Sequence, residues 1–177
     1  MKEKVKEYGG GLFELAVSEG LEEVLLSEVR TLRPLMSAEY LHLLTTPAVP
    51  RSERLGLVSE VMDGRVHPYL ASFVKLVTER GMAMSLPDLF DEYERRYLER
   101  HGIISVSVES AVPLTETQRE RLVSRLEAHT GKRLDMTYHV VPELLGGVRL
   151  SFDDRLADGT ARAALKRLSD ALSETVL

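Results

Sequence analysis

The spacing of apolar residues changes once along this 177-residue chain, close to Gly102. Before that glycine, apolar side chains recur every three or four residues, which places them on one face of a helix. After it, Ile104, Val106 and Val108 alternate with polar residues, which is the spacing of a half-buried strand. The chain is therefore predicted to fold as a helical part followed by a mixed part.

The helical part divides into six runs, separated by glycine, proline or polar clusters. One run holds Tyr8, Leu12 and Leu15 and ends at Gly20, and the next stops before Pro34. The remaining four are expected over roughly 35–44, from Pro50 or Ser52 to Met62, from Leu70 to Val77 before Gly81, and from Leu86 to Tyr97 before His101. Six short helices in about a hundred residues make a complete domain by size.

The mixed part is predicted to run strand, helix, strand, strand, helix. Thr115 with Gln118 fits a capping box that opens a helix ending near Gly131. Alternation returns at 134–140 and 148–152, and the segment 158–160 leads into the last helix. The predicted fold class is α+β overall, with an N-terminal six-helix bundle in residues 1–101 and a small α/β C-terminal unit in residues 102–177.

The first helix contains an unusual run, Gly9-Gly10-Gly11. Each glycine inside a helix costs about 1 kcal/mol relative to alanine. Two interpretations stay open. Either residues 1–8 form a tail and the helix begins near Leu12, or the small residues let a partner helix approach closely and packing recovers the deficit.

Composition and charge exclude several classes of function. The net charge is -5 and neither half of the chain is basic, which argues against nucleic acid as a main partner. The absence of cysteine excludes thiol catalysis, disulfides and zinc sites built on sulfur. No charge-free stretch approaches the roughly 18 apolar residues of a membrane-spanning helix, and the N-terminus has no signal-peptide pattern, so a cytoplasmic location without membrane insertion is expected.

The sequence shows no recognisable set of catalytic residues. Neither glycine-rich phosphate-binding motif occurs, and the five histidines are far apart, without metal-ligand spacing. Asp153, Asp154 and Asp158 form the only tight acidic group, but Leu156 and Leu165 stand where a calcium loop needs ligands. Turn and helix-start roles explain these aspartates better. We therefore expect no catalytic residue, no cofactor and no metal.

Two stretches resemble a known family. Residues 142–150 (PELLGGVRL) and 158–168 (DGTARAALKRL) are similar to the C-terminal signature of the F-type ATP synthase delta subunit, the oligomycin-sensitivity-conferring protein of mitochondria. Leu145 replaces isoleucine and Thr160 replaces serine. Tyr8 with residues 12–16 resembles the opening of the same family, although Gly9 and Gly11 stand where the family usually has alanine.

The resemblance implies a non-catalytic stator subunit. Such a subunit links the catalytic head to the b subunits of the peripheral stalk and resists rotational torque during proton-driven ATP synthesis. Its N-terminal bundle binds N-terminal segments of alpha subunits through its first and fifth helices, and its C-terminal part binds the stalk helices of the b subunits. One copy per complex is expected, held at the inner face of the cell membrane through the complex.

The resemblance also suggests site residues. For the groove that binds the alpha N-terminus, the candidates are Tyr8, Gly11, Leu12, Leu15, Phe73 and Leu76. Apolar helical stripes are usually core, so a core role is favoured for Leu15 and Phe73, whereas Leu76 lies off the main stripe and suits an exposed contact. The signature residues Leu145, Gly146, Gly147, Asp158 and Gly159 are expected to set the fold of the C-terminal unit, through a turn with positive φ and a helix start.

Two other classes of function remain as alternatives. One is an all-helical nucleic-acid-binding adaptor of the antitermination type, which the acidic balance of the chain opposes. The other is a small hydrolase that uses Asp153, Asp154 and Asp158, which the missing base, nucleophile and metal pattern opposes.

Overall fold

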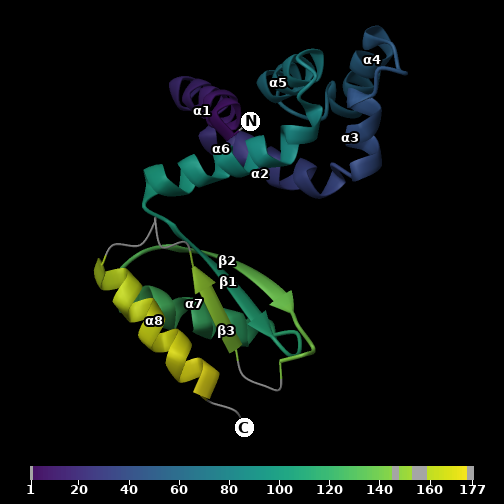
Figure 1. Ribbon diagram of the computed structural model, residues 1–177. Helices are drawn as coiled ribbons and strands as arrows, with labels where there is room; N and C mark the ends of the chain where they lie inside the picture. Colours follow the sequence, from purple (N-terminus) through teal and green to yellow (C-terminus); the bar gives the residue numbers. More distant parts are fainter. Residues whose placement is uncertain (1, 145–147, 153–158, 175–177) are drawn as a thin grey trace. The chain divides into compact units, whose positions relative to one another are not determined.

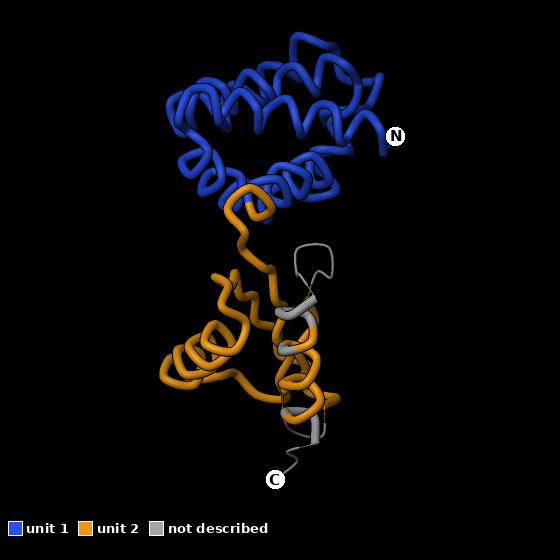
Figure 2. The backbone as a smooth tube through the Cα atoms, turned by 90° about the vertical axis from the view of Figure 1, so that its left-hand side faces the viewer, with its two compact units in different colours: residues 1–97 blue, residues 98–177 orange. Residues whose placement is uncertain are grey.

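The computed structural model describes residues 2–144, 148–152 and 159–174. These residues form an α+β fold, with helices throughout the first part and a three-stranded sheet in the second (Figure 1). The chain divides into two compact units, Met1–Tyr97 and Leu98–Leu177 (Figure 2). The division lies inside a helix that continues to His101, so it precedes the change of apolar spacing at Gly102.

Unit 1 is built from helices that follow the predicted runs. They are α1 (Lys2–Glu19), α2 (Glu22–Leu32), α3 (Ala38–Thr45), α4 (Arg51–Met62), α5 (Pro68–Glu79) and α6 (Leu86–His101), with short 3-10 helices at Arg33–Leu35 and Ala83–Ser85.

The third run begins later than its apolar spacing predicts. Pro34 lies in the first 3-10 helix, and α3 starts only at Ala38. Ser37 caps α3, because its Oγ accepts a hydrogen bond from the backbone N–H of Tyr40 at 3.2 Å. The cap therefore decides where this helix begins.

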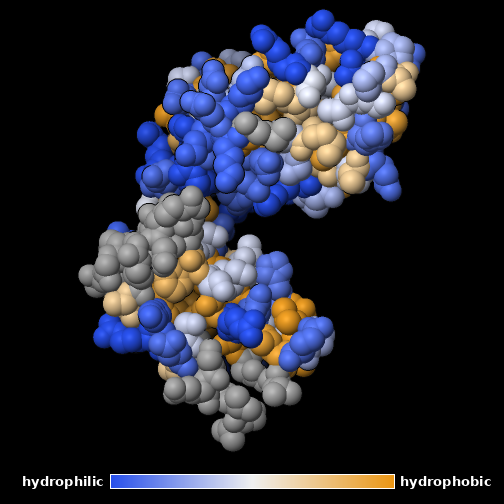
Figure 3. Space-filling view, viewed as in Figure 1, coloured by the Kyte–Doolittle hydropathy of each residue, from blue (hydrophilic) through white to orange (hydrophobic). Residues whose placement is uncertain are grey.

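The core of unit 1 gathers apolar side chains from each of the α-helices α1 to α6. Tyr93 and Phe90 of α6 are the largest fully buried side chains, and Tyr93 meets the ring of Phe13 edge-on, with centroids 5.5 Å apart. On the face of this unit that Figure 3 shows, hydrophilic residues predominate, with a smaller apolar area among them. No helix in the described part of the chain is long and apolar enough to cross a bilayer.

Unit 2 follows the predicted order of elements. It contains β1 (Ile104–Ser110), α7 (Glu116–Thr130), β2 (Leu134–Val140), β3 (Val148–Phe152) and α8 (Gly159–Glu174). The strand order is β2-β1-β3, with β2 parallel and β3 antiparallel to β1.

One face of this sheet is covered by both helices of unit 2. Ile104, Val106 and Val108 of β1 are buried, and they share one cluster with Leu126 of α7 and Leu165 of α8. The intervening residues of β1 are only partly covered. The alternation read from the sequence therefore corresponds to a sheet with one buried face.

The predicted capping box at the start of α7 is confirmed. Thr115 Oγ1 accepts from the backbone N–H of Gln118 at 3.3 Å, and Gln118 Oε1 accepts from the backbone N–H of Thr115 at 2.8 Å. The helix ends at Gly131, which has a φ of 65° that glycine adopts without a steric penalty.

Candidate binding groove

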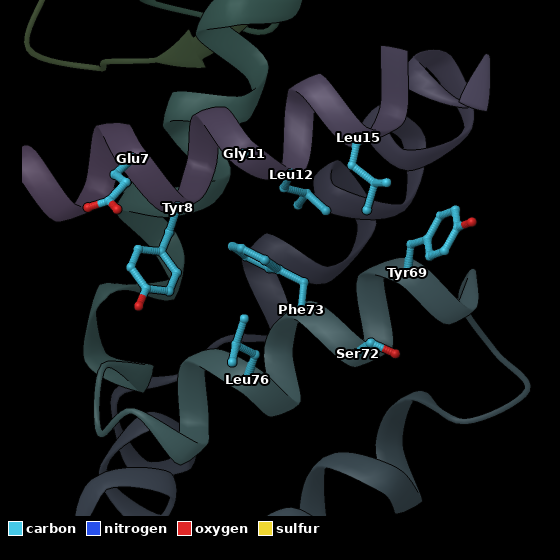
Figure 4. A pocket seen from close by; sticks show the side chains of 9 residues that line it. All are labelled: Glu7, Tyr8, Gly11, Leu12, Leu15, Tyr69, Ser72, Phe73 and Leu76. Atoms are coloured by element: carbon cyan, nitrogen blue, oxygen red, sulfur yellow. The ribbon is translucent and has the colours of Figure 1, made fainter. Parts of the chain in front are cut away.

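An open groove of about 420 Å³ lies between α1 and α5 of unit 1 (Figure 4). All six residues proposed from the sequence for the groove line it, together with three that the sequence analysis did not select. The nine lining residues are Glu7, Tyr8, Gly11, Leu12, Leu15, Tyr69, Ser72, Phe73 and Leu76. Residues more than fifty positions apart in the chain thus meet at one surface.

Both walls of the groove repeat the same helical spacing. On α1 the positions are 8, 11, 12 and 15, and on α5 they are 69, 72, 73 and 76, so each wall follows i, i+3, i+4, i+7. The two helices run in opposite directions, with Tyr8 across from Leu76 and Leu15 across from Tyr69 (Figure 4). Each wall is therefore one continuous stripe along its helix.

The groove has a buried floor and exposed rims. Leu12 is 3% exposed and Phe73 is 8% exposed, so both also belong to the core of unit 1. Leu15 is 37% exposed, which corrects the core role favoured for it. Leu76 is 39% exposed, as its position off the main stripe predicts. These two exposed leucines both face the groove. They leave apolar surface in contact with water, and a partner could cover that surface.

Sequence reasoning missed Glu7, Tyr69 and Ser72. On α5 the strong stripe is Leu70, Phe73, Val74 and Val77, and this stripe is indeed buried. The groove stripe is displaced from it by one residue and shares only Phe73 with it. Looking for a second, adjacent stripe on the same helix would have found Tyr69 and Ser72.

The first helix runs through all three glycines. It begins at Lys2, so the interpretation of residues 1–8 as a tail is wrong. Gly9 and Gly10 are buried, whereas Gly11 is exposed and lines the groove. The glycines therefore do not share one role.

Gly9 and Gly10 let α1 lie close against α6 of the same chain. A Cβ on Gly9 would lie 2.9 Å from the backbone oxygen of Leu89, and a Cβ on Gly10 would lie 2.5 Å from the guanidinium carbon of Arg96. A Cβ on Gly11 would meet nothing within 4 Å. The helix that Gly9 and Gly10 allow to approach closely is therefore α6 of the same unit.

An ionic cluster around the buried carboxylate of Glu92 joins α6 to α1. Glu92 is 7% exposed and accepts hydrogen bonds from Arg95 at 2.8 and 2.9 Å and from Arg96 at 2.9 Å. Arg96 also donates to the backbone oxygen of Lys6 at 3.3 Å and lies 3.5 Å from the carboxylate of Glu14. The hydrogen bonds from Arg95 lower the pKa of Glu92, against the opposing effect of burial. This cluster stabilises α1, and with it one wall of the groove, on α6.

The other wall is set by the start of α5. His67 Nδ1 accepts from the backbone N–H of Tyr69 at 3.3 Å, and Pro68 occupies the first helical position. The backbone N–H of His67 donates to the carboxylate of Glu28 on α2, at 2.9 and 3.0 Å. These contacts fix where α5 begins and therefore where Tyr69 enters the groove.

The signature residues of the C-terminal unit are mostly outside the described residues. This holds for Leu145, Gly146, Gly147 and Asp158, whereas Gly159 is the first residue of α8. Asp153 and Asp154 also lie outside. Among the residues that the structure does describe, no group of three histidine, aspartate or glutamate side chains is arranged to hold a metal ion.

Comparisons with known proteins agree with the resemblance seen in the sequence. Residues 5–172 match the family model described as ATP synthase delta (OSCP) subunit. ATP synthase subunit delta of Desulfitobacterium hafniense is 35% identical over 169 residues, covering 94% of each chain, and that of Chlorobium phaeobacteroides is 30% identical, covering 94% of this chain and 93% of the relative.

A solved structure shares the fold. A chain in the cryo-EM structure of the Toxoplasma gondii mitochondrial ATP synthase hexamer matches with a TM-score of 0.66 at 15% identity, covering 97% of this chain and 98% of that one. At that identity the match supports the fold, while the family model and the bacterial relatives support the family. The chain therefore belongs to the ATP synthase delta (OSCP) subunit family, a family of non-catalytic ATP synthase subunits.

Proposed function

We propose that the groove between α1 and α5 binds the N-terminal segment of an ATP synthase alpha subunit. The observation that supports this most directly is that Tyr8, Gly11, Leu12, Leu15, Phe73 and Leu76 line one apolar groove. A groove with two walls spaced i, i+3, i+4, i+7 suits an amphipathic helix laid between them. The free energy of binding then comes from burial of the apolar rims rather than from any reaction.

In this proposal the protein is a mechanical link of the peripheral stalk. The six-helix bundle of unit 1 holds the catalytic head, and unit 2 binds the stalk helices of the b subunits. One copy per complex joins the two and resists rotational torque during proton-driven ATP synthesis. The protein is held at the inner, cytoplasmic face of the membrane by the complex alone.

Unit 2 offers a surface that supports the stalk contact. Between α7 and α8, the apolar side chains of Leu122, Leu126 and Leu168 lie in a shallow hollow with Arg121 and Arg125 beside them. Leu126 is buried, whereas Leu122 and Leu168 are partly exposed. An amphipathic stalk helix with acidic flanks would complement this surface.

The test of the alpha contact uses Leu76→Asp in the full-length protein. Burying a leucine side chain contributes about 1.5–3 kcal/mol, so we expect this substitution to weaken binding of an alpha N-terminal peptide by more than roughly tenfold. Leu43→Asp on α3 is the matched control, because Leu43 is 45% exposed and does not line the groove. Affinity is measured by calorimetry, and folding of both variants by circular dichroism.

The outcomes separate the competing functions. Loss of binding in Leu76→Asp with retention in Leu43→Asp supports the proposal. Equal affinities of the wild-type protein and both variants would contradict it. Failure of the wild-type protein to bind the peptide, together with salt-dependent binding of RNA, would instead favour the nucleic-acid adaptor.

A further inference from the structure

We propose that Glu7 makes the groove selective for a helix that carries one basic side chain about a turn beyond its apolar stripe. The carboxylate thereby sets the direction in which the partner helix lies. This inference rests on the proposed function and specifies the chemistry of the partner at the same groove.

Glu7 stands out among the residues of the groove by its charge. Of the nine lining residues it alone is charged, and it is exposed. The carboxylates of Glu14 and Glu92 are engaged by Arg96, whereas no ion pair or hydrogen bond of the Glu7 side chain occurs within the described part of the chain. Even Lys4, one turn earlier on α1, forms no ion pair with it there. The Glu7 carboxylate is therefore available to a partner.

The position of Glu7 makes the groove asymmetric. It lies at the end where Tyr8 and Leu76 face each other, and the opposite end is formed by Leu15 and Tyr69 (Figure 4). The apolar part of this wall, from Tyr8 to Leu15, spans roughly two helical turns, or about 10 Å. A partner helix whose apolar stripe is two turns long fills this length. The turn that follows the stripe then lies beside a carboxylate at the Glu7 end of the groove and not at the other end.

A basic residue in that turn decides between the two directions of binding. In one direction a lysine or arginine meets Glu7, and in the other it lies beside Leu15 and Tyr69, where the groove has no opposite charge. An exposed ion pair is modest in free energy, but apolar contacts are nearly the same in both directions, so the ion pair determines the preference.

The experiment uses three synthetic amphipathic peptides with an identical apolar stripe. Each has about 20 residues, enough to form a helix when bound. The first carries one lysine a turn before the stripe, the second one lysine a turn after it, and the third glutamine at both positions. Their affinities for the full-length protein are compared with those for Glu7→Gln and for Glu19→Gln, a control that removes the same charge from the end of α1, outside the groove.

We expect both lysine peptides, which bring the lysine to Glu7 by lying in opposite directions, to bind the wild-type protein about two- to fivefold more tightly than the glutamine peptide, in low salt. Glu7→Gln should abolish that advantage, and Glu19→Gln should keep it. If Leu76→Asp prevents binding but Glu7→Gln leaves all three affinities unchanged, the charge selectivity is refuted and the groove remains the binding site. If none of the peptides binds the wild-type protein, or if Leu76→Asp has no effect on their binding, both proposals fail.

Discussion

At the scale of single residues, the three consecutive glycines of α1 show how one sequence feature divides into separate roles. Gly9 and Gly10 permit close contact with α6, while Gly11 has open space beside it and forms part of the groove. The cost of placing glycine in a helix was evident from the sequence, but the helix that compensates for it was not. Which glycine faces which neighbour depends on the packing of α6.

The glycines predict substitutions with opposite effects on stability. Gly9→Ala forces a methyl group toward the backbone oxygen of Leu89 and should lower the free energy of unfolding by about 1–3 kcal/mol. Gly11→Ala meets nothing within 4 Å and should raise it by about 1 kcal/mol through helix propensity. Urea denaturation of both variants checks this, and a stabilising Gly9→Ala would contradict the close packing of α1 on α6.

Glu92 predicts a pH dependence of stability. Its pKa is lowered in the folded state, so its contribution is present above the unfolded pKa and is lost as the pH falls through the folded value. Glu92→Gln should therefore be less stable than the wild-type protein by about 2 kcal/mol near neutral pH. The difference should shrink below about pH 4. Denaturation at several pH values measures it, and a difference independent of pH would rule out this role for the carboxylate.

At the scale of helices and strands, capping and spacing predicted much of the structure. The stripe of α5, the capping box of α7 and the alternation in β1 all correspond to observed elements. The start of α3 was misplaced, because the apolar spacing continues past Ser37 in both directions and only the cap marks the boundary. Tyr69 and Ser72 of the groove stripe on α5 were missed, since a strong core stripe on the same helix conceals its weaker neighbour.

The capping box of α7 predicts a local effect. Thr115→Ala removes the hydroxyl that accepts from the N–H of Gln118, and should destabilise α7 by about 1 kcal/mol. Thr117→Ala, within the same first turn but outside the cap, is the control and should have little effect. Hydrogen exchange of the α7 amides provides the measurement. Equal exchange rates in both variants would show that the box does not stabilise this helix.

At the scale of the whole molecule, one change of apolar spacing predicted a helical part and a mixed part. The spacing of apolar residues within one helix cannot predict that α1 and α5, which are far apart in the chain, leave an uncovered groove between them. The six groove residues came from resemblance to a family, and Glu7 became evident only when the two helices were seen together. Long-range packing therefore defines the candidate site, although short-range patterns predict its walls.

The most direct test of the account is methyl NMR of the full-length protein, with labelled leucines, during titration with an alpha N-terminal peptide. Binding in the groove predicts that the methyl signals of Leu12, Leu15 and Leu76 shift together with one affinity, while those of Leu43 and Leu150 stay unchanged. Shifts confined to leucines outside the groove, with Leu15 and Leu76 unaffected, would contradict the claim that α1 and α5 hold the catalytic head.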